Sequence, residues 1–200
     1  MCSTGSAVSR SYTKMARRPT DLIYGAALTK LVRQERFGRA AGGAETTNVE
    51  KYQRKAVEDG TGIGCIKTNY RINFRTNTIE ECSKPLDADN GFDYTEDFDG
   101  LQITPFGRIL ISFKSVVGAG GNQTRTLREC YHFAEAQLKL LAFGEKSHFA
   151  NILDGDEAHK RVKHFAHLTS LPEYSPFAKK IYIGDLGGYF DWFNKCATIE

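Results

Sequence analysis

Apolar residues recur at helical spacing in four segments of the chain. These segments predict helices over residues 21–37, 48–58, 124–142 and about 155–168. Thr47 and Glu50 match the T-x-x-E pattern of a capping box, which favours a helix start just after Thr47. The third segment has the clearest stripe, formed by Leu127, Tyr131, Ala134, Leu138 and Leu141. It is the strongest helix prediction in the chain.

Period-two alternation and short apolar runs indicate strands between these helices. The predicted strands are residues 65–75, part of 92–103, 108–117 and 179–186. Within the first of them, polar residues alternate with a set that includes Tyr70 and Phe74, which we expect in the core. Residues 76–90 read as a turn-rich connection, and the aromatic-rich segment 188–196 is expected to dock against the core.

The order of these elements predicts an α/β fold. A small mixed central sheet would be flanked by helices, in the order helix, three strands, helix, strand, with extra helices at the N- and C-terminal ends. Residues 1–19 are rich in Ser, Thr and Arg and predict a flexible basic tail. Residues 20–200 would then form a single domain, with the core of the fold over about 47–184.

The charges are unevenly distributed along the chain. The first 75 residues carry 14 basic and six acidic side chains, whereas residues 76–100 carry one basic and eight acidic ones. A basic region beside an acidic patch suits an anionic partner held near a metal site. Five widely spaced cysteines without a CxxC pair favour a reducing compartment, and no apolar run has the length of a membrane span. We therefore expect an intracellular, soluble protein of the cytoplasm or nucleus without a membrane partner.

Candidate chemistry is concentrated between residues 93 and 128. Asp97 and Asp99 would share one face of a strand, and Ser112 and Lys114 would share one face of the next. If the two strands pair as a hairpin, Asp99 and Lys114 can meet on the same surface. A carboxylate there could hold Mg²⁺ beside a scissile phosphate, while the lysine positions or deprotonates water or stabilises developing charge.

This pattern resembles the PD-(D/E)XK nuclease superfamily, which includes restriction enzymes and Holliday-junction resolvases. Asp99-Gly100 matches the metal-binding aspartate of the family, and Ser112-Phe113-Lys114 takes the place of its (D/E)-X-K triplet. The resemblance implies that Glu50 of the first core helix adds to the site and that Gln123 of the following helix assists catalysis. Ser112 departs from the pattern because serine is a poor Mg²⁺ ligand. Asp97 or Glu50 could supply the missing carboxylate.

The resemblance implies a restriction-endonuclease-like, Mg²⁺-dependent (or Mn²⁺-dependent) endonuclease that hydrolyses phosphodiester bonds of nucleic acid, with DNA favoured. The phosphate contacts are expected from Arg125, Arg128, Lys67 and Arg71. The alternative is a non-catalytic nucleic-acid-binding or assembly protein, for example a viral one, with a degenerate nuclease fold. The match can also be accidental, and a third alternative is an interaction domain with no nucleic-acid role. A palindrome cutter would need a homodimer, and the sequence leaves that open.

Two further segments contain residues that occur in ligand-binding motifs. The glycine turn 118–121 lacks the residues of a Rossmann fingerprint and of a Walker A loop, and would border the DNA groove in the nuclease reading. His164 and His167 are an i, i+3 pair without the flanking Glu of a metalloprotease helix. We expect these histidines to serve at the surface or in packing.

Overall fold

The computed structural model describes residues 43–82, 93–116 and 121–198. The predicted basic tail 1–19 and the predicted helix 21–37 lie outside the described residues, as does most of the glycine turn. The described residues contain two sheets. The larger one has four strands: β3 (Gly100–Thr104), β4 (Gly107–Ser115), β5 (His148–Asp154) and β6 (Ile181–Gly184). The smaller one is a hairpin of β1 (Tyr70–Asn73) and β2 (Thr78–Glu81).

The four-stranded sheet is mixed. Its strand order is β3-β4-β5-β6, with β3 antiparallel to β4 and the other two neighbouring pairs parallel. Within the described ranges, five helical segments accompany it: α3 (Gly43–Thr61), α4 (Gly121–Ala142), α5 (Asp156–Ser170), the 3₁₀ helix η2 (Ser175–Lys180) and α6 (Leu186–Ala197). The predicted α/β class, with a small mixed sheet flanked by helices, is therefore confirmed.

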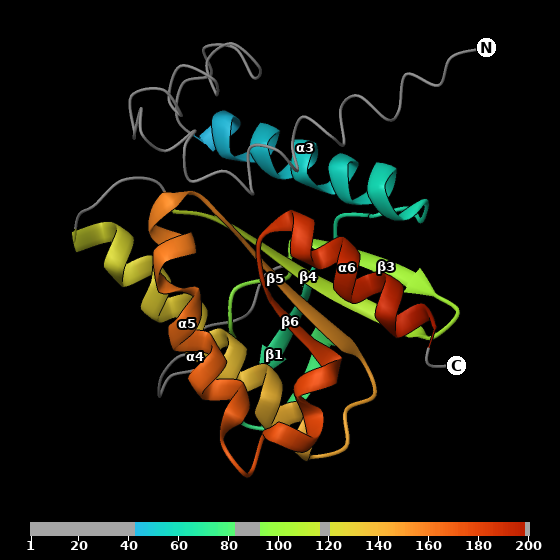
Figure 1. The fold of residues 1–200 in the computed structure, drawn as a ribbon, viewed down its shortest axis with the longest axis vertical. Coiled ribbons are helices and arrows are strands. Elements are labelled where there is room, and N and C mark those ends of the chain that lie inside the picture. Colours follow the sequence, from blue (N-terminus) through green and yellow to red (C-terminus); the bar gives the residue numbers. More distant parts are fainter. Residues whose placement is uncertain (1–42, 83–92, 117–120, 199–200) are drawn as a thin grey trace.

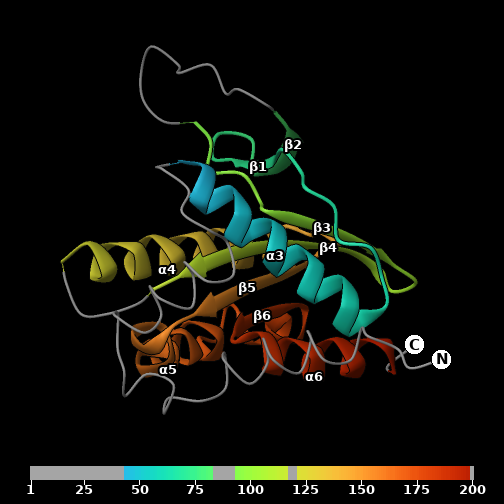
Figure 2. The same cartoon turned by 90° about the horizontal axis from the view of Figure 1, so that it is seen from above.

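Helices cover both faces of this sheet (Figures 1 and 2). Strand β4 shows why, because residues 109–113 are all buried and their side chains alternate between two cores. Ile109, Ile111 and Phe113 pack toward α3 and α6, whereas Leu110 packs toward α4 and α5. The result is a three-layer arrangement of helices, sheet and helices.

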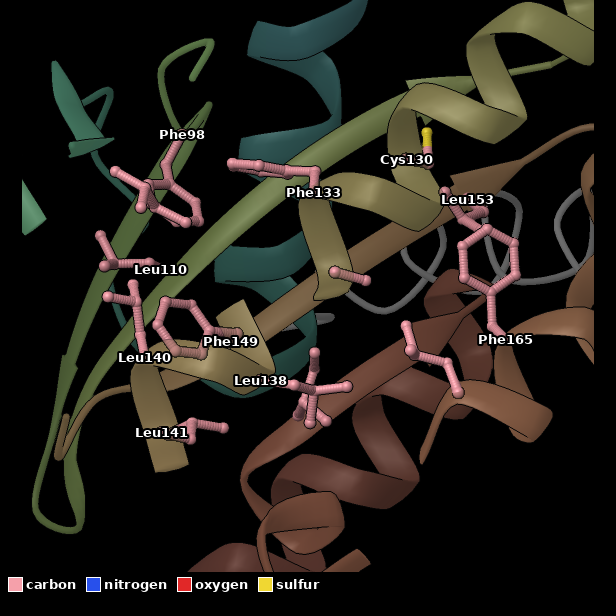
Figure 3. Close-up of a cluster of buried hydrophobic side chains, with 14 of the residues drawn as sticks. Phe98, Leu110, Cys130, Phe133, Leu138, Leu140, Leu141, Phe149, Leu153 and Phe165 are labelled. Atoms are coloured by element: carbon pink, nitrogen blue, oxygen red, sulfur yellow. The ribbon is translucent and has the colours of Figure 1, made fainter. Parts of the chain in front are cut away.

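The core beneath α4 and α5 is rich in aromatic side chains (Figure 3). The ring of Phe98 lies 5.0 Å from that of Phe133 on α4 and 5.8 Å from that of Phe149 on β5, measured between ring centroids. All three side chains are buried. Such ring pairs add stability beyond their buried area, so Phe98 anchors the segment that leads into β3 against the sheet and α4.

Several sequence predictions need correction. Helix α3 begins at Gly43 and ends at Thr61, so Thr47 lies inside the helix and the predicted capping box at its start is wrong. A cap residue must have non-helical backbone, and α3 runs through Thr47 instead. The predicted strand 65–75 is reduced to a bridge at Ile66 and the four residues of β1, which pair with β2 and not with the four-stranded sheet. Phe74 is half exposed rather than part of the core, because the chain turns there toward β2.

Other elements agree with the sequence or were not foreseen by it. Helix α4 buries most of its predicted stripe, and α5 and β6 lie where they were expected. Strand β5 was not predicted, and the aromatic C-terminal segment is the helix α6, which packs on the core through Tyr189 and Phe193. Among the helices of the described ranges, none is both long and apolar enough to cross a bilayer.

Candidate functional site

Asp99 is fixed immediately before β3, at the edge of the sheet where β4 ends. Its backbone N–H donates to the Ile111 carbonyl at 2.8 Å, which extends the β3–β4 pairing by one residue. Its side-chain Oδ2 accepts a hydrogen bond from the backbone N–H of Phe113 at 2.7 Å. The Asp99 carboxylate is therefore held against the residue that precedes Lys114, as the predicted hairpin requires.

Helix α3 contributes to the same place from the other side. The guanidinium of Arg54 donates to the backbone carbonyl of Asp99 at 2.9 Å, so α3 is tied to the start of β3. Glu50 lies one turn earlier on the same helix face, with its carboxylate 4.0 Å from the Arg54 guanidinium. Figure 2 shows α3 passing over the β3–β4 hairpin. Two segments far apart in sequence, α3 and the residue before β3, thus bring Glu50, Arg54 and Asp99 together.

The Asp99 carboxyl has a strongly perturbed proton affinity. Burial raises its pKa to about 7, against the opposing effects of the Phe113 N–H and the Lys114 charge, which favour the ionised form. The negative charges of Glu50 and Glu96 raise the pKa further. Asp99 therefore sits in a negative, partly desolvated environment that a cation would relieve.

Lys114 forms an ion pair with Glu96, an acid that was not predicted from the sequence as a site residue. Its ammonium donates to Glu96 Oε2 at 2.7 Å. Burial works to lower the pKa of Lys114, but the Glu96 and Asp99 carboxylates overcome it, and the net result is a raised pKa. Lys114 is consequently an ammonium at neutral pH, which favours charge stabilisation over proton abstraction as its role.

Glu96→Gln is expected to lower the pKa of Lys114, because the amide removes the nearest negative charge and leaves burial with less opposition. NMR titration of the lysine side-chain signals, assigned with Lys114→Arg, measures this change. Glu58→Gln is the matched control, since Glu58 pairs with the exposed Lys55 instead. An unchanged Lys114 pKa in the Glu96 variant would show that the pair does not control the lysine.

Ser112 lies inside the core. It is 2% exposed, and its partner across the parallel β4–β5 ladder is Asn151, which is also buried. Asn151 and Gln137 of α4 exchange two side-chain hydrogen bonds, at 2.6 and 3.2 Å between the nitrogen and oxygen atoms. The position of the family's second acid is thus part of a buried polar layer under α4, and it supplies no carboxylate here.

The structure does not place Asp97 at this site. Its carboxylate lies 3.3 Å from the Arg71 guanidinium, which also donates to the backbone carbonyls of Cys82 and Thr95. Arg71 therefore ties the β1–β2 hairpin to the acidic segment, which is an internal role. Asp97 and Arg71 pair away from Asp99 because β1, the strand that carries Arg71, belongs to the smaller sheet.

The remaining predicted residues lie on the surface or outside the described side chains. Arg125 is exposed and pairs with Glu129 at 2.8 Å, and Arg128 and Lys67 are also exposed. Gln123 is in the first turn of α4, and the structure describes its helical backbone only. None of these positions is tied by a described contact to Asp99.

A cavity of about 640 Å³ lies between α4 and the β1–β2 hairpin. Its lining includes the half-exposed Phe74, Phe133 and three glutamates, Glu96, Glu129 and Glu135. These carboxylates make it a poor path for a polyanion.

The sequence did not predict the role of Glu96 or the contact between Arg54 and Asp99. Glu96 belongs to an acidic run in which no spacing marks one carboxylate as the partner of Lys114, and only the fold reveals the pair. Arg54 lies four residues after Glu50, which signals a shared helix face but not a contact with Asp99.

Protein-family models, curated proteins and solved structures were compared with the chain. None of them matches. Conclusions about function therefore depend on the geometry around Asp99.

Proposed function

We propose that the chain is a Mg²⁺-dependent nuclease that hydrolyses phosphodiester bonds, with Asp99 and Lys114 at its centre. The observation that carries the proposal is the meeting of a half-buried carboxylate just before β3 and a lysine ammonium near the end of β4. Asp99 accepts the backbone N–H of Phe113, next to Lys114, and the charge of each group shifts the pKa of the other. Glu50 adds a second carboxylate from α3. Perturbed acids and lysines that converge in this way are typical of catalytic sites.

The residues fit a magnesium ion with a small protein ligand set. Within the described side chains no group of three or more His, Cys, Asp and Glu residues could hold a metal ion. Mg²⁺ commonly takes one or two carboxylates and completes its shell with phosphate and water. Asp99 and Glu50 supply two hard oxygen ligands, and their mutual repulsion is the kind that a divalent cation offsets.

Each residue then has a distinct role. Asp99 and Glu50 would hold the ion, which supplies polarisation of the scissile phosphate and a more acidic bound water. Lys114 stabilises the negative charge that develops on the phosphate oxygens, since it is positively charged and fixed by Glu96. Arg54 positions the start of β3 through the Asp99 carbonyl. The Phe113 N–H orients the Asp99 carboxylate.

The order of elements around the site supports the resemblance to the PD-(D/E)XK superfamily. Helix α3 precedes the antiparallel β3–β4 hairpin, and α4 then leads to β5, which lies parallel to β4. The hairpin of β1 and β2 takes the place of the first strand expected in the sheet. This departure leaves β3 at the edge of the four-stranded sheet.

A non-catalytic nucleic-acid-binding protein with a degenerate nuclease fold is the second candidate. The observation that favours it is the buried Ser112, which offers no acid on β4. In addition, the carboxylate of Glu96 compensates the positive charge of Lys114, which a bound phosphate would otherwise contact. Under this alternative the protein binds nucleic acid and leaves it intact.

Incubation with supercoiled plasmid DNA, and separately with single-stranded RNA, tests the two candidates. The nuclease proposal predicts Mg²⁺-dependent cleavage that EDTA stops and that Asp99→Asn abolishes. Asp59→Asn, which alters a carboxylate that pairs with Lys55 at the far end of α3, should cleave like the unaltered protein. Intact nucleic acid in Mg²⁺ and in Mn²⁺, together with salt-sensitive binding, would favour the non-catalytic candidate.

A further inference from the structure

Helix α5 carries a concentrated basic surface that the Asp99 site does not use. Between residues 158 and 172 the chain has three basic side chains, three histidines and no acidic side chain. The six residues are His159, Lys160, Arg161, Lys163, His164 and His167. All six are exposed in the structure. We call them the α5 basic face.

The geometry of the helix arranges most of these residues in two adjacent rows. His159, Lys163 and His167 follow one another at four-residue steps, and Lys160 and His164 form the next row. The opposite side of the helix packs into the core through Ala158, Phe165 and Leu168. The helix is therefore amphipathic, with an outer face that carries basic and hydrogen-bonding side chains.

The acidic residues of α5 are confined to its first turn, at Asp156 and Glu157, where the helix dipole favours them. Among the described side chains, Arg161 and Lys163 have no ion-pair partner, whereas Arg75 pairs with Asp93 at 2.7 Å and Arg125 with Glu129 at 2.8 Å. Among the side chains that the structure describes, no carboxylate therefore competes with an external anion for these two cations.

Helix α5 begins close to the C-terminal ends of β4 and β5, and β4 carries Lys114 near that end. Ser115 of β4 pairs with Asp154 at the end of β5, and the Val116 N–H donates to the Asp154 carbonyl at 2.7 Å. Helix α5 starts two residues later, at Asp156. An extended anion lying along α5 would therefore lead toward the end of β4.

We propose that the α5 basic face binds the phosphodiester backbone of nucleic acid. A row of exposed cations and imidazoles supplies charge and hydrogen-bond donors without reading bases, which is how proteins bind phosphate backbones. A membrane surface fits less well, because it would require exposed large apolar side chains beside the basic ones. The exposed large hydrophobic residues of the described ranges, Ile66, Phe74, Ile103 and Phe143, all lie on other elements. The proposal is independent of the chemistry at Asp99.

The test measures binding of the full chain to short fluorescein-labelled DNA, single-stranded and duplex, in EDTA over a range of salt concentrations. Arg161→Gln/Lys163→Gln should weaken binding roughly tenfold at low salt. It should also reduce the slope of log K against log salt by about 1.4–1.8, because each lost phosphate contact contributes about 0.7–0.9. The control Lys51→Gln/Lys146→Gln removes the same charge from exposed positions elsewhere and should change both quantities much less.

Equal losses in the two double variants, or no loss in either, would overturn the proposal. So would an α5 variant that loses binding to phosphatidylserine-containing vesicles while it binds DNA normally. The outcome is separable from that of the proposed function. Cleavage that depends on Asp99 but survives in an α5 variant with unchanged DNA binding would refute only the α5 proposal. Loss of DNA binding in that variant, with no cleavage by the unaltered chain, would refute only the nuclease.

Discussion

Asp99→Asn is expected to raise the free energy of unfolding at pH 8 by roughly 2–4 kcal/mol, since each unit of pKa shift corresponds to about 1.4 kcal/mol. Burial raises the pKa of Asp99 from 3.8 to about 7 in the folded state. Between these values the folded chain holds a proton that the unfolded chain has released, so stability falls as pH rises. Above about pH 7 the loss is complete. Asparagine avoids it and still accepts the Phe113 N–H through its amide oxygen.

Urea unfolding of both proteins from pH 4 to pH 8.5 measures this effect. The stability difference should be small near pH 4, vanish as pH falls below the unfolded-state pKa of 3.8, where the aspartate is protonated in both states, and grow as pH rises toward 7. Parallel curves over the whole range would mean that Asp99 has no raised pKa. Added Mg²⁺ should stabilise the unaltered protein at pH 8 and not the Asn variant. Only the ionised carboxylate binds the cation in the folded state, and this binding favours folding. Asp59→Asn should show neither effect.

Lys114→Met is expected to reduce Mg²⁺-dependent cleavage by a factor of about 10²–10³, the usual effect of removing one charged or hydrogen-bonding group that stabilises a transition state. Methionine fills much of the lysine volume, so the loss reports the charge. The same change leaves Glu96 without its partner, and Glu96→Gln/Lys114→Met separates the two effects. If the single and double variants are equally inactive, the missing ammonium is the cause.

Single-turnover cleavage with saturating enzyme measures the chemical step for Lys114→Met without interference from weaker binding. Lys114→Arg should retain part of the rate, because it keeps the positive charge but not the geometry of the ammonium. Lys51→Met is the matched control on an exposed position of α3. Cleavage by Lys114→Met at the normal rate would remove Lys114 from the mechanism.

The sequence predicted those parts of the fold that depend on local pattern. The stripe of α4 and the apolar run of β4 each contain enough repeats to specify the element and its buried face. The segment around Phe74 misled, because its alternation persists into a tight turn where Asn77 has a positive φ of 51°. Strand β5 escaped notice because a fully buried parallel strand shows no alternation to identify it.

The candidate site was predictable only in part. The hairpin that joins Asp99 to Lys114 follows from two short runs and a turn, and the structure has it. The partner of Lys114 could not be chosen among neighbouring acids, because the choice depends on how the segment before β3 crosses α4. Asp97 and Glu96 are adjacent in sequence, yet one pairs with Arg71 and the other with Lys114. Successive side chains of an extended segment point in opposite directions, so a shift of one residue decides between a structural and a functional carboxylate.

The paired amides of Gln137 and Asn151 fix the position of α4 along β5. Both side chains are buried and each amide bonds the other, so sliding the helix by one residue along the sheet would break both hydrogen bonds and leave two buried polar groups unmatched. Apolar packing alone tolerates such a slip far better. The amide pair therefore also fixes the position of the earlier turns of α4 relative to β4, the strand that carries Lys114. If both amides are replaced by leucine, we expect the chain to keep its stability but to lose the fixed position of α4 relative to β4.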